Sequence, residues 1–283
     1  MSRPTGAELM ARGLRQLNEA GVPNAARDVR RILAEVCGVE AGRLTIILPD
    51  PVELEAEARF AALIQRRAAR EPVSHLLGRR QFYGRDFKVS RHVLDPRPET
   101  EILIEVALQE PFESVIDLGT GSGCILLTLL AEMPQAQGIG TDLSDEAALV
   151  AEHNIDAHGL TDRAAVVVTS WLDGIEGTVD LIVSNPPYIA QDEMPGLAPE
   201  VLDYEPHMAL TDGGDGLECY RDILASAPKH LDPNGRLIVE IGPTQAAEVS
   251  ALFVMAGMVD IHVVQDLDGR DRVVAGRRPA SVA

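Results

Sequence analysis

The spacing of apolar residues divides the chain into a helical first part and a second part in which strands and helices alternate. Over residues 10–17 and 29–36, apolar positions recur three and four residues apart, which is typical of amphipathic helices. Thr5-Gly-Ala-Glu8 has the form of a capping box, and Asp50-Pro51-Val52-Glu53 places a cap, a proline and an acid in the order that opens a helix. The pattern therefore predicts a small helical bundle over residues 1–80.

A hairpin and a linker are predicted between this bundle and the rest of the chain. Apolar residues lie on both sides of Gly84 over residues 81–89, and a glycine-containing turn between two such runs is typical of a β-hairpin. At Arg97-Pro98-Glu99-Thr100-Glu101, a proline and acids then occupy positions that begin a further helix. Residues 81–97 are accordingly assigned to the hairpin and linker.

From Ser114 onward, short apolar runs alternate with helical patterns, which predicts a parallel sheet covered on both faces. The strands are expected at residues 115–118, 138–141, 164–168, 179–184, 236–241, 258–264 and 271–276. No helical pattern separates the last two, so they should form an antiparallel hairpin at one edge of the sheet. The fold class is therefore α/β: a seven-stranded, doubly wound, Rossmann-like sheet within residues 98–283, preceded by the small helical domain.

Composition indicates a globular protein without a metal site. The hydrophobic fraction is 46%, and no apolar run reaches membrane-spanning length, so we expect a cytoplasmic protein that does not contact a membrane. Cys37, Cys124 and Cys219 lack CxxC spacing, and the histidines form no HExxH pattern. We therefore expect neither a disulfide framework nor a bound metal.

Charge is distributed unevenly along the chain. Residues 1–98 contain 17 Lys and Arg against 12 Asp and Glu, whereas residues 99–283 contain 8 against 32. An acidic second part would repel a phosphate backbone, which argues against nucleic acid as the main partner. The arginine-rich first part suits an acidic protein or an RNA surface, or its arginines are only the solvated faces of helices. The candidate contact face is the group near the domain boundary: Arg66, Arg67, Arg70, Arg79 and Arg80.

A glycine-rich loop follows the first predicted strand of the sheet. Gly119-Thr120-Gly121-Ser122-Gly123 leads directly into a helix, so backbone N–H groups at the helix start can approach a ligand closely. The dinucleotide-binding fingerprint needs a third glycine where this chain has Cys124, so that pattern is not met. Asp142 ends the next strand, where a carboxylate can accept both ribose hydroxyls of an adenosine. Trp171 follows the third strand and either lies against adenine or fills the core.

A later apolar strand ends abruptly at Asn185-Pro186-Pro187-Tyr188. Neither proline has a backbone N–H, so the strand cannot continue and the loop is rigid. The Asn185 side-chain carbonyl and the Pro186 backbone carbonyl can each accept one N–H of a planar NH2 group, with the Tyr188 ring beside it. Taken alone, the same residues suit a stiff turn. In a parallel sheet, however, they share an edge with the glycine loop, and together the two loops indicate a site for an amide or an aromatic amine.

These motifs together resemble the S-adenosylmethionine-dependent methyltransferases that modify planar NH2 groups. The residues that carry the resemblance are Asp117–Gly123, Asp142 and Asn185–Tyr188. Arg97–Glu101 and Tyr204–Leu217 are further similar to the protein-(glutamine-N5) methyltransferases that act on bacterial peptide chain release factors, and the resemblance covers nearly the whole chain. It implies methyl transfer from S-adenosylmethionine, which leaves as S-adenosylhomocysteine, to the side-chain amide nitrogen of a glutamine.

The resemblance also implies roles for individual residues. Cofactor binding would involve Gly119, Thr120, Gly121, Ser122, Gly123, Asp142 and Asn185, with Trp171 against the adenine. The target glutamine would be received by Asn185, Pro186, Pro187 and Tyr188, of which Asn185, Pro186 and Tyr188 would be catalytic. The helical domain would recognise the substrate protein. We expect release factors as partners, a monomeric enzyme, and no contact with DNA.

Three alternatives remain open on the sequence. A DNA adenine-N6 methyltransferase would present the same acceptors to an exocyclic NH2, but it would need a basic cleft for a flipped base. The second alternative is a glutamine methyltransferase that acts on a ribosomal protein. Only the segment Tyr204–Leu217 favours a release factor over a ribosomal protein as the acceptor. The third alternative is a binding module that keeps a nucleotide pocket without catalysis. Residues 190–217 are long, acidic and rich in Pro and Gly, and are expected to form a lid at the substrate entrance.

Overall fold

The computed structural model describes residues 3–280, which divide into two compact units. The first comprises residues 3–79 together with Ala198–Tyr204, and the second comprises residues 80–197 and 205–280. The sequence analysis assigns Ala198–Tyr204 to the second domain, whereas in the structure this segment completes the first unit.

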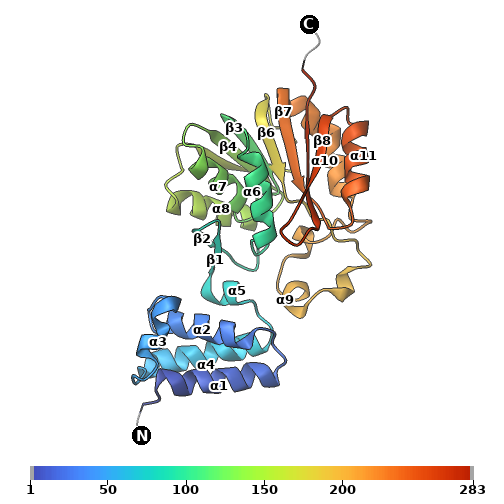
Figure 1. Ribbon diagram of the computed structural model, residues 1–283. Coiled ribbons are helices and arrows are strands. Elements are labelled where there is room, and N and C mark those ends of the chain that lie inside the picture. The colour runs from blue at the N-terminus through green and yellow to red at the C-terminus, as the bar shows by residue number, and fades with distance from the viewer. Residues whose placement is uncertain (1–2, 281–283) are drawn as a thin grey trace. The chain divides into compact units, whose positions relative to one another are not determined.

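The first unit is a helical bundle (Figure 1). Its main helices are α1 (Gly6–Glu19), α2 (Ala25–Val36) and α4 (Leu54–Ala68), and its shorter helical pieces are η1 (Ala41–Arg43), α3 (Leu44–Ile47), α5 (Val73–Leu77) and α9 (Pro199–Leu202). The predicted capping box is confirmed: the Thr5 hydroxyl accepts from the Glu8 N–H, and the Glu8 carboxylate accepts from the Thr5 N–H. Leu17, Val29 and Ile32 are fully buried, so the predicted apolar faces form the core of this unit.

Helix α4 begins at Leu54, later than the cap signal at Asp50 suggested. Pro51 forms an isolated bridge with Thr5, and the Val52 N–H donates to a carbonyl of the same N-terminal segment at 2.8 Å. These contacts keep the segment extended beside the start of α1. Pairing with a distant part of the chain therefore overrides the local cap signal.

A buried arginine ties Ala198–Tyr204 into the first unit. Arg67 Nε donates to Asp28 Oδ2 at 2.8 Å, and Arg67 Nη2 donates to Glu200 Oε1 at 3.0 Å. Only 5% of the Arg67 side chain is exposed. The Tyr204 hydroxyl adds a 2.6 Å hydrogen bond to a backbone carbonyl at the end of α4. Buried charges of opposite sign thus hold this segment of the lid against the helices.

We expect Arg67→Met to lower the free energy of unfolding by about 3–5 kcal/mol, because it leaves the buried carboxylate of Asp28 without its cationic partner and removes one of the two arginines that hold Glu200. Urea unfolding followed by circular dichroism measures the change. Arg59→Met, on the exposed side of the same helix, is the matched control and should alter the free energy of unfolding by less than about 0.5 kcal/mol. Equal losses in the two variants would contradict a structural role for the buried cluster.

The second unit contains a two-stranded hairpin and a seven-stranded sheet. The hairpin consists of β1 (Arg79–Phe82) and β2 (Arg85–Lys88), and the sheet of β3 (Ser114–Leu118), β4 (Gln137–Asp142), β5 (Ala164–Val168), β6 (Val179–Ser184), β7 (Leu231–Glu240), β8 (Val259–Gln265) and β9 (Asp271–Arg277). The spatial order is β5-β4-β3-β6-β7-β9-β8, with β9 antiparallel to both of its neighbours. The predicted strands and the edge hairpin are confirmed, although β7 begins at Leu231 rather than at residue 236.

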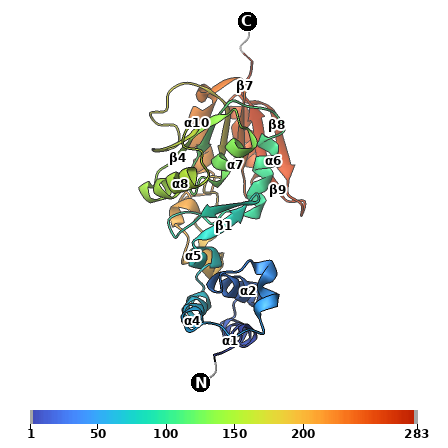
Figure 2. The ribbon, with the colours of Figure 1, turned by 90° about the vertical axis from the view of Figure 1, so that its left-hand side faces the viewer.

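Helices cover both faces of the sheet, as Figures 1 and 2 show. One face carries α6 (Glu101–Ala107), α7 (Cys124–Glu132) and α8 (Asp145–Ala157), and the other carries α10 (Glu218–His230) and α11 (Ala246–Met255), while η2 (Pro98–Thr100), η3 (Met194–Gly196) and η4 (His207–Ala209) are short turns. Along β3, Val115 packs into one core, and Ile116 and Leu118 pack into the other, as a strand buried on both faces requires. None of the helices between residues 3 and 280 is long and apolar enough to cross a membrane.

The strand order brings the two candidate loops together. Strand β3 pairs with β4 on one side and with β6 on the other, so the chain winds outward in both directions from this point. Leu118, at the end of β3, lies opposite Thr141 and Ser184. Ligands bind outside the carboxyl ends of the strands at such reversals of strand order. The loops that follow β3 and β6 therefore meet where a ligand site is expected.

Candidate active site

The glycine loop between β3 and α7 has a backbone shape that depends on its glycines. Gly119, Gly121 and Gly123 have φ of +68°, +56° and +78°, a region that other residues enter only at an energetic cost. The Thr120 hydroxyl donates to the buried carboxylate of Asp117 at 2.7 Å. Burial away from water raises the pKa of Asp117 to about 7. The loop is thus fastened to the strand that precedes it.

Asp142 lies at the carboxyl end of β4, as predicted. Its Oδ2 accepts from the Gly121 N–H and its Oδ1 accepts from the Ser144 N–H, both at 2.9 Å. Each carboxylate oxygen has a further lone pair, so the group can also accept hydroxyls of a ligand. The next residue, Leu143, is apolar yet 64% exposed and lines the same cavity. Asp142 and Leu143 would match a ligand in which a flat apolar ring is attached to a group that carries hydroxyls.

Trp171 packs against the core and also lines the cavity. It follows β5 with φ of +47°, and its Cζ3 lies 3.7 Å from the point where a Cβ on Gly119 would stand. The ring packs against the core between the sheet and α10, and it also lines the cavity at the glycine loop. Filling the core and contacting a ligand are therefore compatible.

A single cavity connects these predicted elements. Its volume is about 270 Å³, near the lower end for small-molecule sites. Besides the glycine loop, Asp142 and Trp171, its wall includes Asn185 and Pro187. The lid contributes Pro206, Met208, Ala209, Thr211 and Asp212. One ligand can therefore reach from the glycine loop to Asn185.

The start of the loop after β6 is anchored by two side chains. The Ser184 hydroxyl donates to the Leu118 carbonyl at 2.8 Å, which fixes the end of β6 to the end of β3. Asn185 Nδ2 donates to Thr100 Oγ1 at 3.2 Å. Because the amide nitrogen is engaged with Thr100, the Asn185 carbonyl oxygen is the atom left to accept from a ligand in the cavity.

The other residues of this loop differ in their relation to the cavity. Pro187 lines it, whereas Pro186 and Tyr188 are not among the lining residues. The Tyr188 ring packs against the core, and its hydroxyl donates to Glu240 Oε1 at 3.4 Å. Burial raises the pKa of Tyr188 above its usual range. The sequence predicted this ring beside a ligand; in the structure it braces the loop from the core side.

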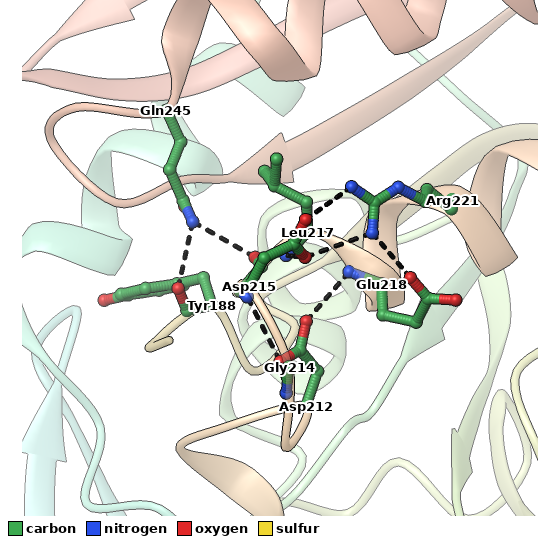
Figure 3. A network of polar contacts seen from close by, with 9 residues as sticks. Tyr188, Asp212, Gly214, Asp215, Leu217, Glu218, Arg221 and Gln245 are labelled. Atoms are coloured by element: carbon green, nitrogen blue, oxygen red, sulfur yellow. Dashed lines mark hydrogen bonds and ion pairs between the residues drawn. The ribbon is translucent and has the colours of Figure 1, made fainter. Parts of the chain in front are cut away.

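The predicted lid, residues 190–217, begins shortly after β6. Hydrogen bonds hold its first and last residues close to each other. Gln245 Nε2 donates to the Tyr188 carbonyl at 2.9 Å and to the Gly216 carbonyl at 3.1 Å (Figure 3). The Ile189 N–H donates to the Leu210 carbonyl at 3.0 Å. The lid is therefore a closed loop with Gln245 at its neck.

Charged side chains fix the returning part of the lid. Asp212 Oδ1 accepts from the Gly214 N–H at 2.7 Å, and its Oδ2 accepts from the Glu218 N–H at 2.8 Å (Figure 3). Arg97 Nη2 donates to both carboxylate oxygens of Glu205, at 2.7 and 2.8 Å. Arg97 and Asp212 also line the cavity. Charge-assisted hydrogen bonds thus hold this wall in place.

Three residues that support the site were not predicted from the sequence. Thr100 lies in the Arg97–Glu101 motif, which is similar to the glutamine methyltransferases, but the sequence indicates no role for this residue. Glu240 had a usable signal, because an acid within the apolar run Leu237–Ile241 is rarely buried without a function or a partner. Gln245 had no signal in the sequence, since a single glutamine at the start of a helix resembles many surface residues.

The arginine group suggested as a contact face is engaged within the protein. The ion pairs are Arg66–Glu71, Arg67–Asp28, Arg70–Glu200, Arg79–Glu35 and Arg80–Asp95. Arg67 is buried and cannot meet a partner protein. The side chains of Arg66 and Arg79 are 52% and 54% exposed, so only Arg67 is removed from the suggested contact face, and the role of the other arginines stays a prediction.

Two parts of the chain match known protein families. Residues 8–78 match the family described as PrmC N-terminal domain, and residues 89–217 match the family described as methyltransferase small domain. A methyltransferase structure from Pyrococcus furiosus has the same fold, with a TM-score of 0.55 and 17% identity over 77% of this chain and 98% of that one.

Two curated relatives cover nearly the whole chain. A release factor glutamine methyltransferase from Cereibacter sphaeroides is 53% identical, over 97% of this chain and 99% of the relative. A protein of the same name from Agrobacterium fabrum is 42% identical, over 96% of each chain. At this identity and coverage, the chain belongs to the release factor glutamine methyltransferase family.

Proposed function

We propose that this protein transfers a methyl group from S-adenosylmethionine to the side-chain amide nitrogen of a glutamine in a peptide chain release factor. The observation that carries the proposal is the common cavity: Asn185, whose amide nitrogen is held by Thr100, lines the same space as the glycine loop and Asp142. Methyl donor and acceptor amide thus share one site. Membership of the family supports a release factor as the acceptor, and because release factors act in translation we expect the reaction in the cytoplasm.

The residues around the cavity fit S-adenosylmethionine. The Asp142 carboxylate suits the ribose hydroxyls, and the apolar side chains of Leu143 and Trp171 suit the adenine. Gly119 and Gly121 let the backbone approach the ligand closely. When bound, the cofactor supplies a methyl group that is activated by a positively charged sulfur.

The loop after β6 would act on the acceptor nitrogen. An amide nitrogen is a poor nucleophile because its lone pair is delocalised into the carbonyl. We assign the Asn185 side-chain carbonyl to one N–H group of the acceptor. To the other we assign the backbone carbonyl of Pro186, which directly follows Asn185 but does not itself line the cavity. As positive charge develops on the nitrogen, both carbonyls hold it more strongly, which favours the transition state over the ground state. Once methylated, the nitrogen loses one proton to water.

We expect Asp142→Ala to weaken S-adenosylmethionine binding by about 10- to 100-fold, the size of losing one hydrogen bond to a charged group. Isothermal titration calorimetry measures the dissociation constant. Asp145→Ala, an exposed carboxylate at the start of α8 outside the cavity wall, is the control and should bind like the wild type. Unchanged affinity in Asp142→Ala would remove this residue from the proposed cofactor site.

Methyl transfer from labelled S-adenosylmethionine to several purified acceptors tests the function. Label on a release factor, assigned by mass spectrometry to a glutamine side chain, would support the proposal. The same release factor with that glutamine replaced by asparagine is the control and should remain unlabelled. Label on DNA or a ribosomal protein but not on a release factor, or no transfer at all, would refute it.

A further inference from the structure

Thr100 and Glu240 are buried polar residues next to the Asn185 side chain. Thr100 is 2% exposed and Glu240 is 1% exposed. Asn185 Nδ2 donates to Thr100 Oγ1 at 3.2 Å, and the Thr100 side chain also interacts with the Glu240 carboxyl, whose pKa it lowers. Glu240 Oε2 is buried and has no hydrogen-bond partner among residues 3–280, so it is available to accept the hydrogen of the Thr100 hydroxyl. The three side chains thus form a short relay that begins in the core and ends at the cavity.

The relay determines which end of the Asn185 amide faces the cavity. An asparagine amide has an acceptor end and a donor end of nearly the same shape, and a hydroxyl can pair with either. A carboxylate only accepts, so it takes the hydrogen of the Thr100 hydroxyl and leaves Oγ1 as an acceptor for the Asn185 NH2 group. We propose that Glu240, acting through Thr100, holds the Asn185 amide with its carbonyl oxygen toward the acceptor. Both are positioning residues, and the inference rests on the proposed function.

Groups from several elements surround the Glu240 carboxyl. The Tyr188 hydroxyl donates to Oε1 at 3.4 Å, Arg272 on β9 favours the negative charge, and Glu99 on η2 opposes it. The Tyr220 hydroxyl on α10 donates to the Glu240 backbone carbonyl at 2.9 Å. Burial has the largest effect and raises the pKa of Glu240 to about 7. The carboxyl therefore changes its charge within the ordinary working range of pH.

The sign of the pH effect follows from the direction of the hydrogen bonds. Above about pH 7 the charged carboxylate only accepts, and the relay keeps the Asn185 carbonyl toward the cavity. Below this pH the protonated carboxyl can donate to Thr100. The hydroxyl can then donate to Asn185 and let the amide turn its NH2 group toward the acceptor. Turnover should therefore fall as the pH falls through about 7.

Thr100→Val tests the relay because it removes the hydroxyl and keeps the shape. We expect kcat for methylation of a release factor to fall by about 10- to 100-fold, and the dissociation constant of S-adenosylmethionine to stay within about threefold. Thr100→Ser restores a hydroxyl and should keep kcat within about threefold of the wild type. Thr128→Val in α7 is the matched control, because this residue is also buried and its hydroxyl has no partner in the described chain.

Glu240→Gln tests the carboxylate, because an amide can donate to Thr100 at every pH. We expect a reduced kcat and the loss of the rise in kcat that is expected of the wild type near pH 7. Burial raises the pKa of Asp117 to the same range, so a pH dependence that the variant and the wild type share is not assigned to Glu240.

The possible results separate the relay from the proposed function. Wild-type kcat in Thr100→Val, an equal loss in Thr100→Ser, or a wild-type pH profile in Glu240→Gln would each overturn the relay. If the wild-type enzyme itself transfers no methyl group to a release factor in this assay, the proposed function fails first.

Discussion

Replacing Asn185 by alanine is expected to lower the turnover of methyl transfer to a release factor by roughly 10²-fold or more, as does the loss of comparable preorganised polar groups in other active sites. The affinity for S-adenosylmethionine should fall much less. The reason lies in the position of the side chain: its nitrogen is engaged by Thr100, and its carbonyl is left for the acceptor. Single-turnover kinetics with saturating cofactor, together with calorimetric binding of the cofactor, measure the two effects separately.

The matched control for Asn185→Ala is Gln137→Ala, which removes an exposed side-chain amide at the opposite end of the sheet. Its turnover should equal that of the wild type. A near-wild-type turnover in Asn185→Ala would count against the proposed role. So would a loss of cofactor affinity with unchanged turnover at saturating cofactor, because this would indicate that Asn185 binds the ground state as strongly as the transition state.

The parts of the site that the sequence predicted are those whose signals are local. The glycine loop needs positive φ at Gly119, Gly121 and Gly123, and only glycine supplies this conformation cheaply. Asp142 and Asn185 each end a short apolar run, and the alternation of strands and helices places such ends at one edge of a parallel sheet. The fold class and the meeting of the two loops follow from these few features.

The parts that escaped prediction depend on pairs of residues far apart along the chain. Gln245 braces Tyr188 from a distance of 57 residues, and Arg67 meets Glu200 across 133 residues. No property of Gln245 or Glu200 by itself indicates its partner. The same reason explains why α4 begins late, since the pairing of Pro51 competes with a local cap signal.

Substitution of Gly216 by alanine is expected to have a similarly large effect, from outside the cavity. Gly216 has φ of +78°, and a Cβ there would stand 2.4 Å from the Tyr188 carbonyl oxygen and 3.0 Å from Gln245 Nε2. At 2.4 Å the backbone must move, because the obstacle is a main-chain atom rather than the end of a flexible side chain. The atom displaced belongs to the loop that carries Asn185.

We therefore expect Gly216→Ala to lower turnover by about 10²-fold, as a displacement of about 1 Å at a reacting group can do. Gly213→Ala separates this effect from backbone strain, because Gly213 also has φ of +78° but has nothing within 4 Å of the added Cβ. Both variants should lose about 1–2 kcal/mol of stability from the left-handed conformation. Only Gly216→Ala should lose turnover. Methyl transfer measures the turnover, thermal unfolding measures the stability, and calorimetry measures the binding of the cofactor. Equal turnover in the two variants would show that the neck of the lid does not position the loop after β6.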